Sequence, residues 1–166
     1  MNLVIQSTLK TLEKSQSLLD KLTDDQLCNA SVSPYYSSIG THIRHILDFY
    51  DCLFNINLEN QIDLTARSRN KDVETKCDCA INYLNVIINK LKVSDFEMET
   101  TVSVTDDLGM GTIEIPYTYG ALLAQANSHT IHHYAIINYI FDRLGIITND
   151  SDFGYNPTTP NGYVIN

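Results

Sequence analysis

The sequence predicts an all-α protein, a four-helix bundle of the up-down-down-up type with a short β-hairpin between its third and fourth helices and an extended C-terminal tail. Four long segments repeat apolar residues at helical intervals. A β-branched, turn-rich stretch separates the last two segments, and the chain ends in a segment rich in Asn, Asp, Gly, Pro and Thr. With 166 residues, the chain is long enough for one domain and short for two. We therefore expect a single helical domain over residues 1–166.

The four amphipathic segments have recognisable ends. We expect helices over residues 2–22, 38–54, 71–92 and 119–144. Ser37 or Ser38 could cap the second helix, because a serine hydroxyl accepts a hydrogen bond from a free N–H of the first turn. Gly145 can end the fourth helix, because glycine readily adopts the left-handed conformation found after many helices. Four such segments favour a bundle in which the apolar faces meet.

The segments between these helices differ in character. Residues 58–70 are polar and predict a loop. Residues 97–115 combine β-branched residues with the turn-forming sequence DDLGMG at 106–111, which predicts the hairpin, and Pro116 closes it. Residues 146–166 predict the extended tail. The four cysteines match no zinc-binding spacing, so we interpret them as reduced thiols packed as small apolar side chains.

Charge and hydropathy argue against nucleic acids and membranes as partners of the protein. The net charge of −9 disfavours binding to nucleic acid or to a membrane surface, because both are anionic. No apolar run approaches the ~20 residues that span a bilayer. The first 20 residues lack the basic start and continuous apolar stretch of a signal peptide. We expect a cytoplasmic protein.

The five histidines form two clusters. His42 and His45 lie on the second predicted helix, and His129, His132 and His133 lie on the fourth. Residues four apart on a helix share one face, so the imidazoles of His129 and His133 can reach the same ion. A third imidazole from the second helix would complete a three-histidine site with an open coordination position. The competing interpretation is that these histidines only pack in the bundle.

The choice of third ligand depends on the position around the second helix. Periodicity places His42 nearer the centre of the apolar arc and therefore deeper than His45, which lies at the edge of the arc. Asp48 could orient an imidazole as a supporting carboxylate, or it could be a solvated helix residue. His132 could line the same cavity or point away from the ion. The residues alone leave His42 and His45 open as alternatives.

Four stretches of the chain resemble a known superfamily. They are SIGTHIRHILD at 38–48, RSRNKDVE at 67–74, SHTIHHYA at 128–135 and DFGYNPTT at 152–159. In this order they resemble the DinB-like, YfiT-type superfamily of metal-binding bundles. The resemblance implies a four-helix bundle with a metal bound by His45, His129 and His133. His42 then remains an alternative ligand or a residue that supports one. Zinc or nickel is the implied metal, and imidazole suits both.

The resemblance also implies a kind of chemistry. Members of the superfamily include thiol-dependent transferases, so we expect a metal-dependent S-transferase or hydrolase that uses a low-molecular-weight thiol, or water, against a small electrophilic substrate. The chain departs from the nearest branch, because it has Tyr119 to Leu122 where that branch carries an Arg-Glu pair.

Two arginines are candidate substrate-binding residues, and two other functions remain as alternatives to the enzyme. Arg67 and Arg69 could hold an anionic group or be surface charges. The alternative functions are a non-catalytic metal-binding bundle, serving in stress or dimerisation, and a bundle without metal. A homodimer is compatible with either kind of bundle.

Overall fold

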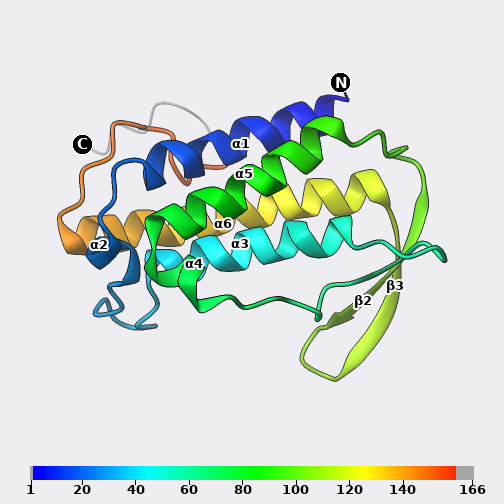
Figure 1. The fold of residues 1–166 in the computed structure, drawn as a ribbon, viewed down its shortest axis with the longest axis horizontal. Coiled ribbons are helices and arrows are strands. Elements are labelled where there is room, and N and C mark those ends of the chain that lie inside the picture. Colours follow the sequence, from blue (N-terminus) through cyan, green and yellow to red (C-terminus); the bar gives the residue numbers. More distant parts are fainter. Residues whose placement is uncertain (1, 160–166) are drawn as a thin grey trace.

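The computed structural model describes residues 2–159. Within this part of the chain, four long helices lie side by side (Figure 1): α1 (Leu3–Leu19), α3 (Ile39–Phe54), α5 (Cys77–Val93) and α6 (Tyr119–Leu144). Helices α1 and α6 run in one direction, and α3 and α5 run in the other. Helix α3 packs against α5 and α6, and α1 packs against the same two helices. The predicted, mostly helical fold is therefore confirmed.

Two short helices, α2 (Asp24–Cys28) and α4 (Lys71–Thr75), correct the predicted helix ends. The first helix ends at Leu19 rather than at residue 22, because Thr23 begins α2 with a reciprocal cap to Gln26. The helix predicted over 71–92 is wrong as a single unit. It breaks at Lys76, which has extended backbone angles, and the next N–H, that of Cys77, donates to Asp24 Oδ1 at 2.9 Å.

The predicted isolated hairpin is also wrong, because the strands belong to a larger sheet. Strands β2 (Thr101–Asp107) and β3 (Thr112–Thr118) pair antiparallel, and β1 (Gln61–Asp63) adds to β2 in parallel. Strand β1 lies inside the segment predicted as a loop. It is only three residues long, too short for an alternating pattern to stand out.

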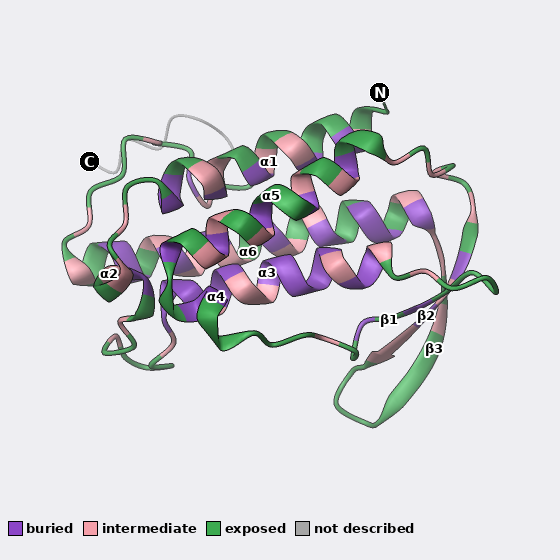
Figure 2. Cartoon of the chain, viewed as in Figure 1, coloured by how far each residue is buried: buried purple, intermediate pink, exposed green. Residues whose placement is uncertain are grey.

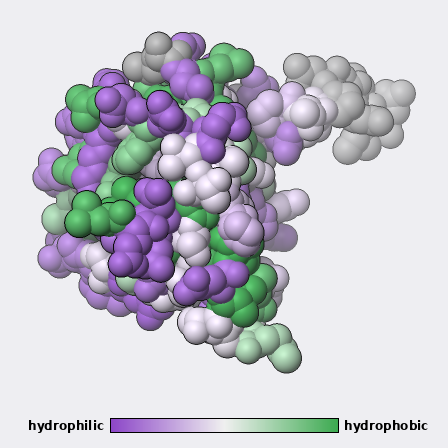
Figure 3. All heavy atoms as spheres, turned by 90° about the vertical axis from the view of Figure 1, so that its right-hand side faces the viewer, coloured by the Kyte–Doolittle hydropathy of each residue, from purple (hydrophilic) through white to green (hydrophobic). Residues whose placement is uncertain are grey.

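The core lies between the long helices, whose buried faces turn inward (Figure 2). Helix α3 has more buried residues than any other described helix. Ser38, one of the two predicted caps, accepts a hydrogen bond from the Thr41 N–H at its start. Gly145 ends α6 with a φ of 67°, as predicted. Figure 3 views the end of the molecule at which the sheet lies. Apolar side chains gather at the lower edge of this face. In the turn between β2 and β3, Leu108 and Met110 are exposed.

The described part of the tail packs against α6 rather than running extended. Residues 151–154 form a turn. Phe153 is buried and stacks on Tyr134 and Phe141, with ring centroids 4.7 and 5.6 Å away. Gly154 lies so close to the α6 backbone that a Cβ atom there would be 2.8 Å from Ala135 Cα. Residues 160–166 of the predicted tail lie outside the described residues.

Helix α1 also contacts α6 at Tyr134. The Tyr134 hydroxyl donates to the Thr11 carbonyl at 3.0 Å and shares a hydrogen bond with the Ser15 hydroxyl, so α1 holds the middle of α6. Among the described residues, no helix is both long and apolar enough to cross a membrane.

Candidate metal centre

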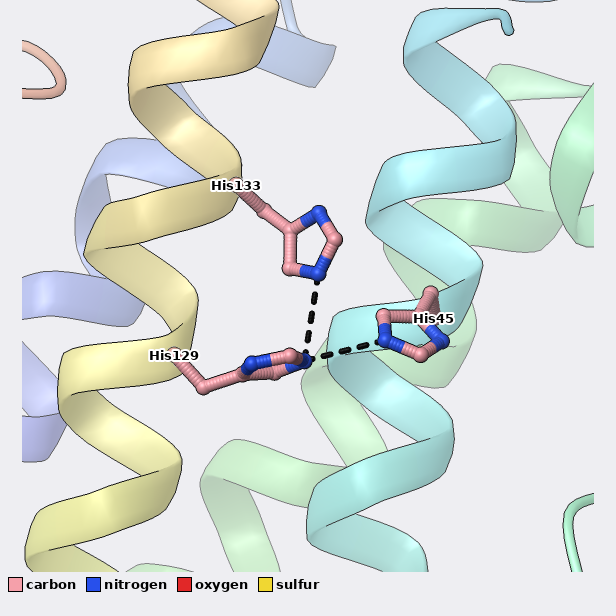
Figure 4. A group of neighbouring side chains, drawn as sticks. All are labelled: His45, His129 and His133. Carbon is pink, nitrogen blue, oxygen red and sulfur yellow. Dashed lines mark hydrogen bonds between the residues drawn. The ribbon is translucent and has the colours of Figure 1, made fainter. Parts of the chain in front are cut away.

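Three histidines from two neighbouring helices meet at one point (Figure 4). His45 comes from α3, and His129 and His133 come from α6. The Nε2 atom of His129 lies 2.9 Å from His45 Nε2 and 3.1 Å from His133 Nε2. One nitrogen from each ring can be chosen so that all three lie within 4.8 Å of one another. The structure therefore brings together the three residues that the sequence analysis expected as ligands.

The protonation of these rings suits metal binding. Burial, reinforced by the charge of Arg67, lowers the pKa of His45 to about 4. Burial and the neighbouring histidines lower the pKa of His133 to about 2, and the pKa of His129 is lowered for similar reasons. All three imidazoles are neutral at pH 7, so each has a lone pair to offer.

The distances also suit one shared ion. Two nitrogens bound to the same tetrahedral zinc ion at ~2.0–2.1 Å are ~3.3–3.4 Å apart. The observed separations of 2.9 and 3.1 Å are slightly shorter. The donor set therefore fits a divalent ion that prefers imidazole.

The cluster has an apolar side and an open side. The Phe49 ring packs 5.2 Å from the His129 ring, and Phe49 is buried. The three candidate ligands are only partly buried. His132 is exposed, with its ring centroid 5.4 Å from that of His133 and 6.4 Å from that of His129. It lies at the rim of the cluster, and a small molecule could approach from there.

His42 contacts the cluster through the ring of His133. It is buried, as periodicity predicted, with 9% of its surface exposed. Its Nδ1 lies 2.8 Å from His133 Nδ1, and its Nε2 lies 2.9 Å from the Ser37 hydroxyl. An imidazole can donate or accept, so His42 can accept the Nδ1 proton of His133 while His133 offers Nε2 to a metal. The sequence analysis considered Ser37 only as a helix cap and missed this contact.

We expect the change His42→Phe to weaken zinc binding by about 10–100-fold, the usual effect of removing a group that orients a ligand. Phenylalanine preserves the ring but removes the acceptor of the His133 proton. Competition with a chromophoric chelator at fixed pH would measure the affinity. Ser37→Ala is the matched control, one contact further from the cluster, and it should cost less. An unchanged affinity in His42→Phe would show that His42 does not orient His133.

Asp48 was considered above as a carboxylate that could orient an imidazole, but its hydrogen bonds go to other groups. Its carboxylate is 1% exposed and accepts hydrogen bonds from Arg44 at 3.1 Å, the Arg69 backbone N–H at 3.1 Å and the Tyr83 hydroxyl at 3.2 Å. Arg44 also pairs with Glu74 at 3.0 Å. These contacts tie α3 to α4 and to residues 64–70. Asp48 thus holds the loop that carries the two arginines, instead of orienting an imidazole.

The two arginines take different positions. Arg67 Nη1 lies 2.8 Å from His45 Nδ1, and Arg67 Nε donates to the Leu64 carbonyl at 2.9 Å. The guanidinium carbon lies 5.9 Å from the centre of the Phe49 ring. Arg69 is exposed and anchors the loop through its backbone. Arg67 therefore reaches the cluster, through a contact across 22 residues that no local pattern could indicate.

A mostly helical domain with three neutral imidazoles aimed at one point belongs to the class of proteins that can hold a divalent metal between helices. The family model described as the DinB superfamily matches residues 8–137. The chain belongs to the DinB superfamily, and the matched segment contains all three histidines of the cluster. No curated protein and no solved structure matches the chain.

Proposed function

We propose that the protein is a metal-dependent enzyme in which His45, His129 and His133 hold zinc or nickel. The single observation that carries the proposal is the convergence of three neutral imidazoles within 4.8 Å on a partly buried surface. Three protein ligands are the number found in catalytic zinc sites, which keep one position open. A bound divalent ion would act there as a Lewis acid that lowers the pKa of a thiol or a water molecule.

The residues around the cluster have separate tasks in this proposal. His42 fixes the ring of His133 by taking its outer proton. Phe49 shields the His129 side from water, which strengthens electrostatic interactions within the site. Arg67 supplies a cationic group beside His45. The proposed substrate is a small electrophile, attacked by the sulfur of a low-molecular-weight thiol or by the oxygen of water.

The thiol is expected to come from outside the protein. Cys52 follows His45 on α3, but burial raises its pKa to about 11, so it is protonated at neutral pH. Its sulfur also donates a weak hydrogen bond to the Ala66 carbonyl at 3.7 Å. A protonated, buried sulfur is a poor nucleophile, which favours a diffusible thiol as the co-substrate.

The proposal can be tested by stripping the protein with a chelator and reloading it with zinc or nickel. Elemental analysis should give one ion per chain. The reloaded protein should accelerate the reaction of 2-mercaptoethanol with 1-chloro-2,4-dinitrobenzene, or the hydrolysis of 4-nitrophenyl acetate, and the stripped protein should not. His129→Ala should lose both metal and activity. Stoichiometric metal without either activity would instead favour a non-catalytic metal-binding protein, and no metal uptake would refute the proposal.

A further inference from the structure

The outer face of α5 carries no charge along its middle. Helix α5 packs against α1, α3 and α4 on one side, and exposed residues follow the other side (Figure 2). Between Asp78 and Lys92, every exposed residue of this helix is uncharged. These residues are Asn82, Asn85, Val86 and Asn89. Charged residues are depleted from the centres of protein interfaces, so this surface, with Asp78, Lys92 and Val93 at its ends, has the composition of a contact. We call it the α5 face.

The bundle gives the middle of the α5 face no partners. Val86 is 48% exposed and Val93 is 82% exposed. The amides of Asn82, Asn85 and Asn89 form no hydrogen bond within the described part of the chain. Valine and asparagine are also weaker helix formers than the charged residues typical of exposed helix positions. A second molecule on this face would bury the valines and give the amides hydrogen-bond partners.

The charges at the two ends of the face are opposite in sign and unpaired. Asp78 lies eight residues before Val86, and Lys92 lies six residues after it. Neither forms an ion pair with a described residue, whereas the nearby Lys90 is paired with Asp51 at 2.8 Å. The face is therefore charged in a way that complements its own reverse.

This charge pattern selects one partner and one orientation. Two copies of α5 that meet antiparallel around Val86 bring Asp78 of each copy to the end of the other helix that carries Lys92. A parallel contact would instead place Asp78 against Asp78 and Lys92 against Lys92, and like charges repel. The best complement for the α5 face is thus the same face of a second copy, turned end to end.

We propose that the protein self-associates through the α5 face, with two copies of α5 antiparallel around Val86. The contact is isologous, so each interaction occurs twice about a two-fold axis. The 17 residues of α5 extend ~25 Å, which makes this a small interface of less than about 1,200 Å². We therefore expect a reversible dimer with a dissociation constant of about 10–100 μM. The inference does not depend on the metal centre.

Sedimentation equilibrium over a protein concentration series of about 1–500 μM tests the surface. Val86→Glu places a carboxylate against its own copy on the two-fold axis, so the dissociation constant should rise at least about tenfold. The matched control is Tyr139→Glu, which adds the same charge at a 76% exposed position of α6. Its dissociation constant should stay within about twofold of the wild-type value.

A charge exchange tests the orientation. Asp78→Lys and Lys92→Glu should each weaken the dimer, because each replaces two attractive contacts with two repulsive ones. The double variant restores opposite charges, and its dissociation constant should return to within about threefold of the wild-type value. General repulsion between acidic chains cannot produce this pattern, because Asp78→Lys makes the chain less acidic and yet should weaken the dimer.

Cross-linking tests the same orientation independently. Cys79 and Val93 are each seven residues from Val86, so an antiparallel contact places Val93 of one copy near Cys79 of the other. Val93→Cys should therefore form a disulfide-linked dimer under mild oxidation. The same variant with Cys79→Ala should not, although it keeps the exposed Cys28.

The contrary results are equally clear. A wild type that stays monomeric over the whole concentration series overturns the proposal, and so does a Val86→Glu variant that dimerises like the wild type. A double charge variant that remains as weak as the single variants overturns the antiparallel arrangement. All the substituted residues of α5 lie on its outer side, and circular dichroism verifies that each variant is folded.

Discussion

His133→Ala is expected to weaken zinc binding by two to three orders of magnitude. Four-ligand zinc sites have binding free energies of ~10–16 kcal/mol, so one ligand accounts for ~3–4 kcal/mol. His133 is the middle of a chain of contacts, with His129 on its Nε2 and His42 on its Nδ1. Removing it therefore deletes one proposed ligand and leaves His42 Nδ1 without its partner. Chelator competition at fixed pH measures the change.

The neighbouring residue provides a matched control. His132 is exposed, and its ring lies beside the cluster. His132→Ala removes an imidazole from the same turn of α6, and zinc affinity should stay within about twofold of the wild-type value because no ligand is lost. Equal losses in the two variants would mean that the histidines bind metal without a defined geometry, contrary to the ligand set proposed above.

Gly40→Ala is expected to destabilise the fold by about 3 kcal/mol or more, at the upper end of the range for overpacked cores. A Cβ atom at position 40 would lie 2.0 Å from the Glu74 carbonyl oxygen and 2.7 Å from its carbon, both backbone atoms. Helices α3 and α4 would have to separate. Equilibrium unfolding in urea gives the free energy of unfolding.

Gly120 is the control for this substitution, because it is also a helical glycine. Its Cβ would lie 3.0 Å from Met98 Cβ and 3.1 Å from the Met98 carbonyl oxygen, so Met98 would have to move by only a few tenths of an ångström. Gly120→Ala should change the free energy of unfolding by less than about 1 kcal/mol, the size of the helix-propensity difference between the two residues. If Gly40→Ala were equally mild, the close packing of α3 on α4 would not be essential.

The helices could be predicted where buried apolar residues repeat at helical spacing along the chain. The same rule wrongly predicted one helix over residues 71–92, which the structure divides at Lys76. Val73, Cys77, Ala80 and Leu84 are all buried and follow one another at helical spacing. The stripe therefore continues across a residue whose backbone is extended. The break is stabilised by a hydrogen bond between Cys77 and Asp24, across 53 residues. A contact of that range leaves no local pattern.

The histidine cluster, too, was predictable only where local spacing reveals it. Spacing identified His129 and His133 because both lie on one face of one helix. Periodicity correctly ranked His42 as deeper than His45, yet depth alone does not say which ring reaches α6 at the level of His129. The superfamily motif supplied that register. Arg67 was noticed for its charge, but its contact with His45 depends on the path of residues 64–70, which the ion-pair network of Asp48 and Arg44 fixes in three dimensions.

The packing of the tail on α6 sets the rotation of that helix about its axis. Tyr134 directly follows His133 and is held by Thr11, Ser15 and Phe153 on the face turned away from the cluster. A rotation of α6 by ~20° would move an imidazole nitrogen by ~2 Å, given the radius of a helix with side chains. Metal–ligand distances tolerate deviations of only ~0.2 Å. The C-terminal segment thus helps to fix the rotation of α6, and we expect that ending the chain before Phe153 would misplace the three histidines of the proposed metal centre without changing any of them.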